Sequence, residues 1–113
     1  MEIQMYVRLP NPIADYVDAI ARGDVDGMVQ PFAADGVVVS DDGRRHQGRP
    51  AIRTWIQETS AAKGTVLTPD TLCHETSRIV VEGVKTGDFE GSPRRFVLAF
   101  ELDGGAIKTM EAA

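Results

Sequence analysis

The sequence of 113 residues contains a single cysteine, no long apolar run and no strong cluster of basic residues. One cysteine excludes an internal disulfide and any zinc site built from several thiolates, and we expect Cys73 to be a small buried apolar side chain. No segment approaches the ~20 apolar residues of a membrane span. Residues 1–6 lack the basic region and apolar run of a secretory signal. A cytoplasmic protein with no membrane partner is expected.

The sequence also has fewer positive than negative charges, with 12 Lys and Arg residues against 17 Asp and Glu residues. The net charge is −5, and the basic residues are scattered except for the pairs Arg44-Arg45 and Arg94-Arg95. Proteins that bind nucleic acid neutralise phosphates with clustered Lys and Arg, so a nucleic-acid partner is not expected. The pair Arg94-Arg95 is expected to lie on a solvated rim of the fold. The two histidines share no metal-binding spacing, and we expect neither a metal nor a cofactor.

The first part of the chain carries helical patterns. The length of the whole sequence suits one domain, residues 1–113. A stripe at spacings of three and four residues predicts a helix over residues 12–22. Asn11 is a candidate cap for this helix, and Gly23 is placed to end it in a left-handed conformation. The stripe consists of Ile13, Tyr16, Val17 and Ile20.

A second helix and a hairpin follow. Asp24 can cap the second helix, and Pro31 should end it near Gln30 because proline lacks an N–H and clashes with the preceding turn. Three consecutive valines, 37–39, favour a strand, and Asp42-Gly43 is a turn signal that returns the chain through residues 44–47.

A third helix should begin at Gly48-Arg49-Pro50 and end near Gly64. Residues 65–113 read as strands separated by Gly and Pro. In one of them, Phe96, Leu98, Phe100 and Leu102 alternate with less apolar residues. The order predicts an α+β fold with helices packed on one face of a curved, mostly antiparallel sheet.

Three segments of the chain carry a family resemblance. Residues 16–29, Phe32-Ala33-Ala34-Asp35-Gly36-Val37 and Gly48-Arg49-Pro50-Ala51-Ile52-Arg53 closely resemble the nuclear-transport-factor-2-like superfamily, and within it the SnoaL-like group. The run Gly87–Pro93 and the strand after it are similar to the closing strands of such proteins. The pattern is spread over about residues 12–112.

The resemblance implies a cone-shaped barrel: N-terminal helices pack on a curved sheet that wraps an apolar cavity. Such proteins are often dimeric through the outer face of the sheet. The strand Phe96–Leu102 has apolar side chains on both faces, so we expect a homodimer in which Val97 and Ala99 meet a partner sheet. Members include isomerases, polyketide cyclases, dehydratases, epoxide hydrolases and domains without chemistry, so the fold alone does not name an activity.

Ketosteroid isomerase is the nearest catalytic template in this superfamily. There a carboxylate base moves a proton while a tyrosine and a protonated aspartic acid hold the enolate oxygen. Tyr16 falls at the tyrosine position, Ser40 at the base position and Leu98 at the position of the protonated acid. A serine does not abstract a carbon-bound proton unaided, so steroid isomerisation by that mechanism is not expected.

Three residues are candidate catalytic groups: Tyr16 as a hydrogen-bond donor, and Asp42 or His74 as a base. Asp41 and Asp42 both follow the base position, although Asp-Asp-Gly is also ordinary turn sequence. His74 would act as an acid or base if its strand turned it inward.

Six residues are expected to line a mainly apolar cavity for a small, ring-like apolar molecule: Tyr16, Ser40, Trp55, Phe96, Leu98 and Met110. Tyr16 and Ser40 would be its few polar contacts. Trp55 either floors the cavity or fills the core, and Tyr16 either contacts the ligand or is a core aromatic residue. No Ser/His/Asp set is recognisable around Ser40, and His46 is expected to be solvated.

Two functions remain open at this stage. One is an isomerase, cyclase or hydratase-type enzyme acting on a ring-like molecule. The other is a ligand-binding or dimerisation module that has lost its catalytic residues.

Overall fold

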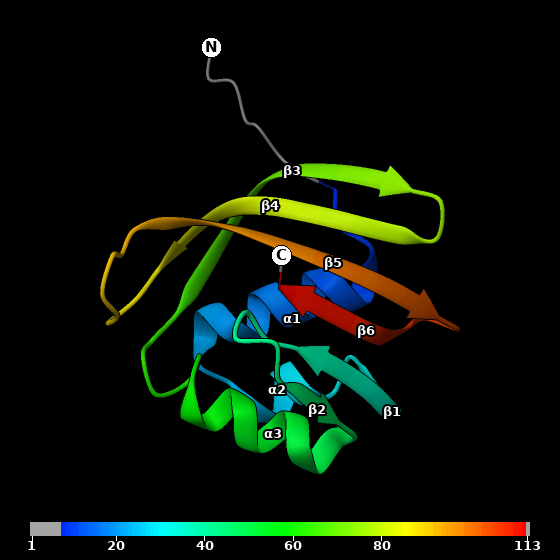
Figure 1. Cartoon of the computed structure of the whole chain (residues 1–113), viewed down its shortest axis with the longest axis horizontal. Helices are drawn as coiled ribbons and strands as arrows, with labels where there is room; N and C mark the ends of the chain where they lie inside the picture. Colours follow the sequence, from blue (N-terminus) through cyan, green and yellow to red (C-terminus); the bar gives the residue numbers. More distant parts are fainter. Residues whose placement is uncertain (1–7, 113) are drawn as a thin grey trace.

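A computed structural model describes residues 8–112, in which helices cover one face of a single curved sheet (Figure 1). The helices are α1 (Asn11–Arg22), α2 (Val25–Val29) and α3 (Arg49–Glu58). The strands are β1 (Phe32–Val39), β2 (Arg45–Gln47), β3 (Val66–Glu75), β4 (Arg78–Thr86), β5 (Arg94–Asp103) and β6 (Ala106–Ala112). The predicted α+β fold is confirmed. The absence of a signal in residues 1–6 was a prediction about residues outside the described part of the chain.

Helix α1 begins after a proline and ends at a glycine. Its N-cap is Pro10, with no side-chain capping bond, so the expectation that Asn11 caps the helix is wrong. Asn11 is instead the first helical residue, because the helix starts directly after Pro10 and carries Pro12 in its first turn. Gly23 ends the helix at φ 66°, a left-handed conformation that glycine adopts without steric cost.

Helix α2 is short and is tied to its neighbours by polar contacts. The side chain of Asp24 accepts a hydrogen bond from the Gly27 N–H at 3.0 Å, as expected of an N-cap. The helix ends at Val29, two residues before Pro31. The Arg49 guanidinium donates to the Phe32 carbonyl oxygen at 2.7 Å, so the start of α3 is fixed to the corner between α2 and β1.

Helix α3 is shorter than the sequence indicates. It ends at Glu58, not near Gly64, because Thr59 has a non-helical backbone (φ −117°, ψ −87°). The Thr59 hydroxyl donates to the Trp55 carbonyl at 2.6 Å, which satisfies a carbonyl of the last turn. Turns then lead to Gly64, whose φ of 58° redirects the chain into β3.

The six strands form one open sheet in the order β2-β1-β6-β5-β4-β3. Every neighbouring pair is antiparallel except β1 and β6, which are parallel. A register shift in β3 between Pro69 and Thr71 lies opposite Gly83 of β4. A side chain at Gly83 would meet the backbone of β3, so glycine permits the close approach of the two strands at this bend.

The core lies between the helices and the concave face of the sheet. Its largest fully buried side chains come from both layers: Tyr16, Phe32, Phe100, Ile13, Met28, Ile52, Ile56, Ile107 and Met110. Cys73 is exposed, so the expectation that it is buried is wrong. It pairs with Val80 on the convex face, which no helix of residues 8–112 covers. None of the helices described is long and apolar enough to cross a membrane.

Candidate ligand-binding cavity

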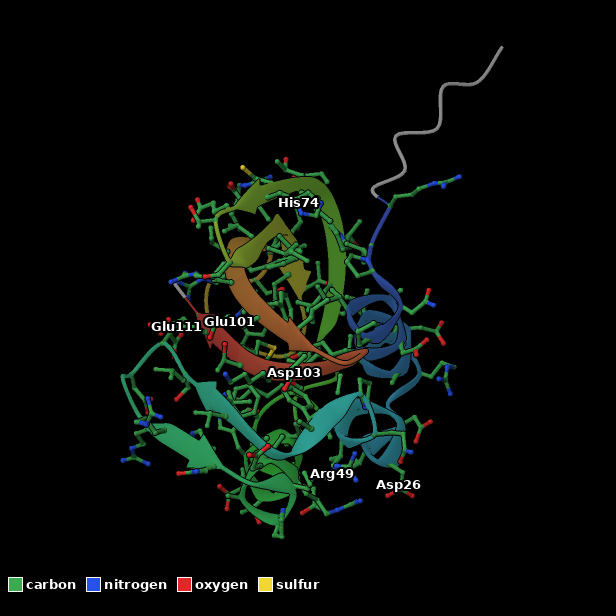
Figure 2. All side chains as sticks on the ribbon, turned by 90° about the vertical axis from the view of Figure 1, so that its right-hand side faces the viewer. Asp26, Arg49, His74, Glu101, Asp103 and Glu111 are labelled. Carbon is green, nitrogen blue, oxygen red and sulfur yellow. The ribbon has the colours of Figure 1, made fainter. Side chains whose placement is uncertain are left out.

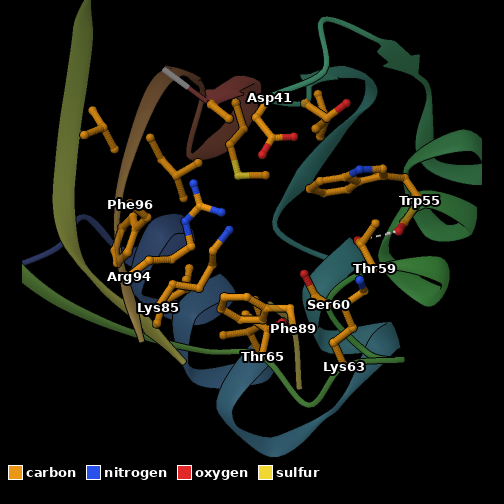
Figure 3. A pocket seen from close by; sticks show the side chains of 18 of the residues that line it. Asp41, Trp55, Thr59, Ser60, Lys63, Thr65, Lys85, Phe89, Arg94 and Phe96 are labelled. Atoms are coloured by element: carbon orange, nitrogen blue, oxygen red, sulfur yellow. Dashed lines mark hydrogen bonds between the residues drawn. The ribbon is translucent and has the colours of Figure 1, made fainter. Parts of the chain in front are cut away.

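A cavity of about 540 Å³ lies between the concave sheet and the helices (Figure 3). This volume falls in the range of small-molecule sites, roughly 300–1,000 Å³. Its apolar lining residues are Ile20, Val38, Val39, Trp55, Leu67, Phe89, Phe96, Val97, Leu98, Met110 and Ala112. Its polar and charged lining residues are Tyr16, Ser40, Asp41, Thr59, Ser60, Lys63, Thr65, Lys85, Glu90, Arg94 and Arg95.

All six residues expected at the cavity do line it: Tyr16, Ser40, Trp55, Phe96, Leu98 and Met110. Whether they bind a ligand stays a prediction. The lining is more polar than the sequence predicts, because the basic side chains of Lys63, Lys85 and Arg94 reach it from the turn after α3, from β4 and from β5. Sequence reasoning missed these residues, since their positions depend on strand register.

Trp55 forms one wall of the cavity. It is half-buried on α3, and its ring lies 5.6 Å from the ring of His46, centroid to centroid, at a tilt of 30°. The expectation that His46 is simply solvated is therefore wrong, because its ring packs against Trp55. The hairpin pairs His46 with Val38 and so brings it beside the helix. Phe96 stands on the opposite side of the cavity, so two aromatic rings face the space between them (Figure 3).

Tyr16 projects from α1 into the base of the cavity. It is 2% exposed, and its ring meets Phe32 edge-on at 5.8 Å. Burial raises the pKa of the Tyr16 phenol well above its usual value, and hydrogen bonding with the Ser60 side chain lowers it by less. The phenol is consequently protonated at neutral pH and can donate a hydrogen bond.

Ser40, Asp42 and His46 form a polar cluster at the end of the hairpin. The Ser40 hydroxyl donates to an Asp42 carboxylate oxygen at 2.5 Å, and its oxygen lies 3.3 Å from Nε2 of His46. A hydroxyl has one proton, and here the shortest contact of the Ser40 oxygen goes to the carboxylate. In a catalytic triad the serine donates its proton to the histidine instead, so this geometry differs from a triad. The cluster braces the hairpin.

Asp42 and His74, the two candidate bases, both lie outside the cavity lining. Asp42 is exposed in the hairpin turn, where the hydrogen bond from Ser40 and then that from the Arg44 N–H hold its pKa below the usual value. His74 shares the face of β3 with Leu72 but is exposed beyond the core, away from α3 (Figure 2). Asp41, which the sequence analysis considered beside Asp42, is the hairpin carboxylate that points into the cavity (Figure 3).

The pair Arg94-Arg95 is divided between two roles. Arg95 forms a two-point ion pair with Asp70, with N–O distances of 2.9 and 3.0 Å. Arg94 extends into the cavity beside Lys85 (Figure 3). Arg94 is exposed, as expected of a solvated rim, but its strand position places it on the concave face with Phe96, so it also lines the cavity.

Comparison with known proteins identifies the family of this chain. A family model described as a SnoaL-like domain matches residues 13–110. The chain belongs to the SnoaL-like family. A candidate polyketide cyclase from Sinorhizobium meliloti has a similar structure, with a TM-score of 0.84 and 32% sequence identity over 93% of this chain and 95% of that one.

Two more distant structures share the fold of this SnoaL-like domain. TerC, co-crystallised with polyporic acid, has a TM-score of 0.77 and 18% identity over 91% of this chain and 88% of its own. A Mycobacterium tuberculosis protein in complex with estradiol-17β-hemisuccinate has a TM-score of 0.76 and 18% identity over 90% and 89%. A comparison of the SnoaL-like domain with curated proteins finds no match.

Proposed function

We propose that this SnoaL-like domain binds a small, ring-shaped organic molecule in the cavity between α3 and β5. The observation that carries the proposal is the pair of aromatic walls, Trp55 and Phe96, on opposite sides of a cavity of about 540 Å³. Flat aromatic walls favour a planar ligand, since stacked and edge-on ring contacts contribute roughly 0.5–1.5 kcal/mol beyond area burial. Two distant neighbours of the same fold were crystallised with small organic molecules, polyporic acid and estradiol-17β-hemisuccinate.

Trp55 gives a direct way to test binding, because it is the only tryptophan in the sequence. A library of planar aromatic and steroid-like molecules should contain compounds that change its fluorescence. A ligand at a hundredfold excess over its Kd stabilises the native state by about 2.7 kcal/mol, which should raise Tm by several degrees.

Leu98→Arg is the variant that separates cavity binding from surface binding. It places a long charged side chain inside the cavity and should abolish the rise in Tm. Thr68→Arg adds the same charge at an exposed position that does not line the cavity, and it should leave the rise unchanged. A library without any hit, or hits that survive Leu98→Arg, would remove the basis of the proposal.

A second candidate function is proton transfer at the bound molecule. One observation favours it: the Asp41 carboxylate points into the cavity, one residue after the position of the isomerase base. Tyr16, protonated at neutral pH, would donate a hydrogen bond to an oxygen that gains negative charge. Leu98 at the third position removes the protonated acid of the ketosteroid isomerases, so the reaction would differ from theirs.

Exchange of an acidic C–H of a bound ligand for deuterium, followed by NMR, tests this chemistry without knowledge of the product. Asp41→Asn should reduce the exchange rate by about 10²–10⁴-fold, the usual contribution of general acid–base catalysis, while binding persists. Asp42→Asn is the matched control in the same turn. Equal exchange in wild type and Asp41→Asn would leave a binding module, the alternative function.

The convex face of the sheet is the proposed contact of a homodimer. Val97 pairs with Glu82, and Ala99 pairs with Val80, on the side of the sheet opposite the helices. Val80 and Val97 are half-buried in the single chain. A second copy would cover these valines.

A further inference from the structure

Two basic side chains face each other at one end of the cavity. Lys85 of β4 and Arg94 of β5 are direct partners in the antiparallel register. Both side chains extend from the concave face into the cavity, with their nitrogen atoms turned toward its centre (Figure 3). Lys63, from the turn before β3, contributes a third cation to the lining.

Like charges directly opposite one another in a sheet are destabilising. Other arginines in residues 8–112 form ion pairs with carboxylates, for example Arg95 with Asp70 and Arg53 with Asp26. Lys85 and Arg94 form no ion pair within those residues, although the chain carries a net charge of −5 and therefore an excess of carboxylates. The local contact of Lys85 is the Phe89 ring, 5.3 Å from its Nζ.

The cavity does contain two carboxylates, Asp41 and Glu90. Neither lies within 4.0 Å of a basic nitrogen of residues 8–112, so the cations keep their capacity to bind an external anion. Asp41 disfavours an acidic group in its own part of the cavity. The charge distribution therefore favours a ligand with an acidic group and orients that group toward Lys85 and Arg94, away from Asp41.

We propose that Lys85 and Arg94 bind an acidic oxygen group, a carboxylate or an ionised enol, on a ring-shaped ligand whose ring lies between Trp55 and Phe96. The proposal rests on the proposed binding function and narrows its ligand class from ring-shaped organic molecules to those that carry an acidic group. A guanidinium donates two parallel hydrogen bonds to two oxygens, and an ammonium adds a point charge. The competing explanation is that both side chains are simply hydrated at the cavity mouth.

Matched probes separate these explanations. 2-Naphthoate and naphthalene-2-carboxamide have nearly the same shape but differ in charge. 2-Hydroxy-1,4-naphthoquinone, ionised at neutral pH, and its neutral methyl ether test an enolate in the same way. If Lys85 and Arg94 bind the acid, the wild type should bind at least one anion about tenfold more tightly than its neutral partner, the effect of roughly one charge-assisted hydrogen bond.

The variants Arg94→Gln and Lys85→Gln should each remove about that tenfold preference and leave the affinity for the neutral probe unchanged. Lys108→Gln is the control for net charge, because Lys108 is exposed on β6 and does not line the cavity. A preference that persists in both cavity variants, or that Lys108→Gln also removes, overturns the proposal. The pair of probes that shows the preference identifies the acid as a carboxylate or an enol.

A measurement without ligand tests the same charge pair independently. If Lys85 and Arg94 repel each other, Arg94→Gln should raise Tm at low salt, and added salt should reduce that gain. A Tm lowered by several degrees would make Arg94 a structural residue and overturn the inference. Tight binding of the neutral probes alone would also overturn it but leave the proposed function standing, whereas no binding of any ring molecule would end both.

Discussion

The buried phenol of Tyr16 should make the stability of the protein fall steeply at alkaline pH. Burial holds the folded-state pKa of Tyr16 above that of the unfolded chain, where the phenol is exposed to water and titrates near about 10. The protonated phenol therefore contributes its full stabilisation below about pH 10, and that contribution is lost as the pH rises toward the folded-state pKa.

The slope of the effect follows from one proton. Above about pH 10 the unfolded chain releases the Tyr16 proton while the folded chain keeps it, which lowers the free energy of unfolding by about 1.4 kcal/mol per pH unit. Tyr16→Phe removes this dependence, and all other groups titrate in both proteins. Urea unfolding at several pH values should therefore show the variant gaining on the wild type above pH 10 by about that slope.

At neutral pH the comparison has the opposite sign. Tyr16→Phe loses the hydrogen bonding with Ser60, a net cost of about 0.5–1.5 kcal/mol. The two stability curves should then cross in the alkaline range. In a Tyr6→Phe background, Tyr16 is the only tyrosine, and its absorbance reports its own ionisation. A phenol that titrates near about pH 10 in the folded protein, or a stability difference independent of pH, would refute the reasoning.

Three further predictions concern the sheet, the dimer and the chemistry. Gly83→Ala places a Cβ against the Thr68 carbonyl oxygen and 2.7 Å from Cα of Pro69, so urea unfolding should show a loss of about 1–3 kcal/mol; an unchanged midpoint would mean that β3 yields freely. Val80→Glu, which lies on the convex face and outside the cavity lining, should convert a homodimer to a monomer in light scattering, and a wild type that is monomeric at micromolar concentration contradicts the dimer. Steroid isomerisation should be negligible because Ser40 is not a carboxylate, and turnover near that of a true isomerase would contradict this.

The sequence predicts the elements of this fold well where local chemistry decides them. The stripe that contains Ile13 and Ile20, the cap at Asp24 and the turn at Gly43 act within a few residues, and each appears in the structure as expected. The end of α3 is different. Gly64 is a good stop signal, but Thr59 leaves the helix earlier because its hydroxyl and backbone satisfy the last carbonyls in a non-helical conformation.

The cavity was less accessible to sequence reasoning because its polar groups meet through strand register. Lys85 and Arg94 lie on two strands joined by a loop, and only their pairing shows that they face each other. His46 reaches Trp55 only because the hairpin places it opposite Val38. Cys73 shows the same dependence, since apolar character alone does not say which face of a strand turns to solvent.

The placement of β6 between β1 and β5 also determines the order in which the molecule can fold. Strands β3, β4 and β5 form a continuous antiparallel meander, whereas β1 and β2 are joined to it only through β6. Until β6 is seated, the two halves share no strand pairing, and closing the parallel pair joins residues from opposite ends of the sequence. Trp55 belongs to one half and Phe96 to the other, so the cavity is complete only when β6 has joined the two halves. Before that step the apolar concave surface is open, which makes the half-folded chain prone to aggregate.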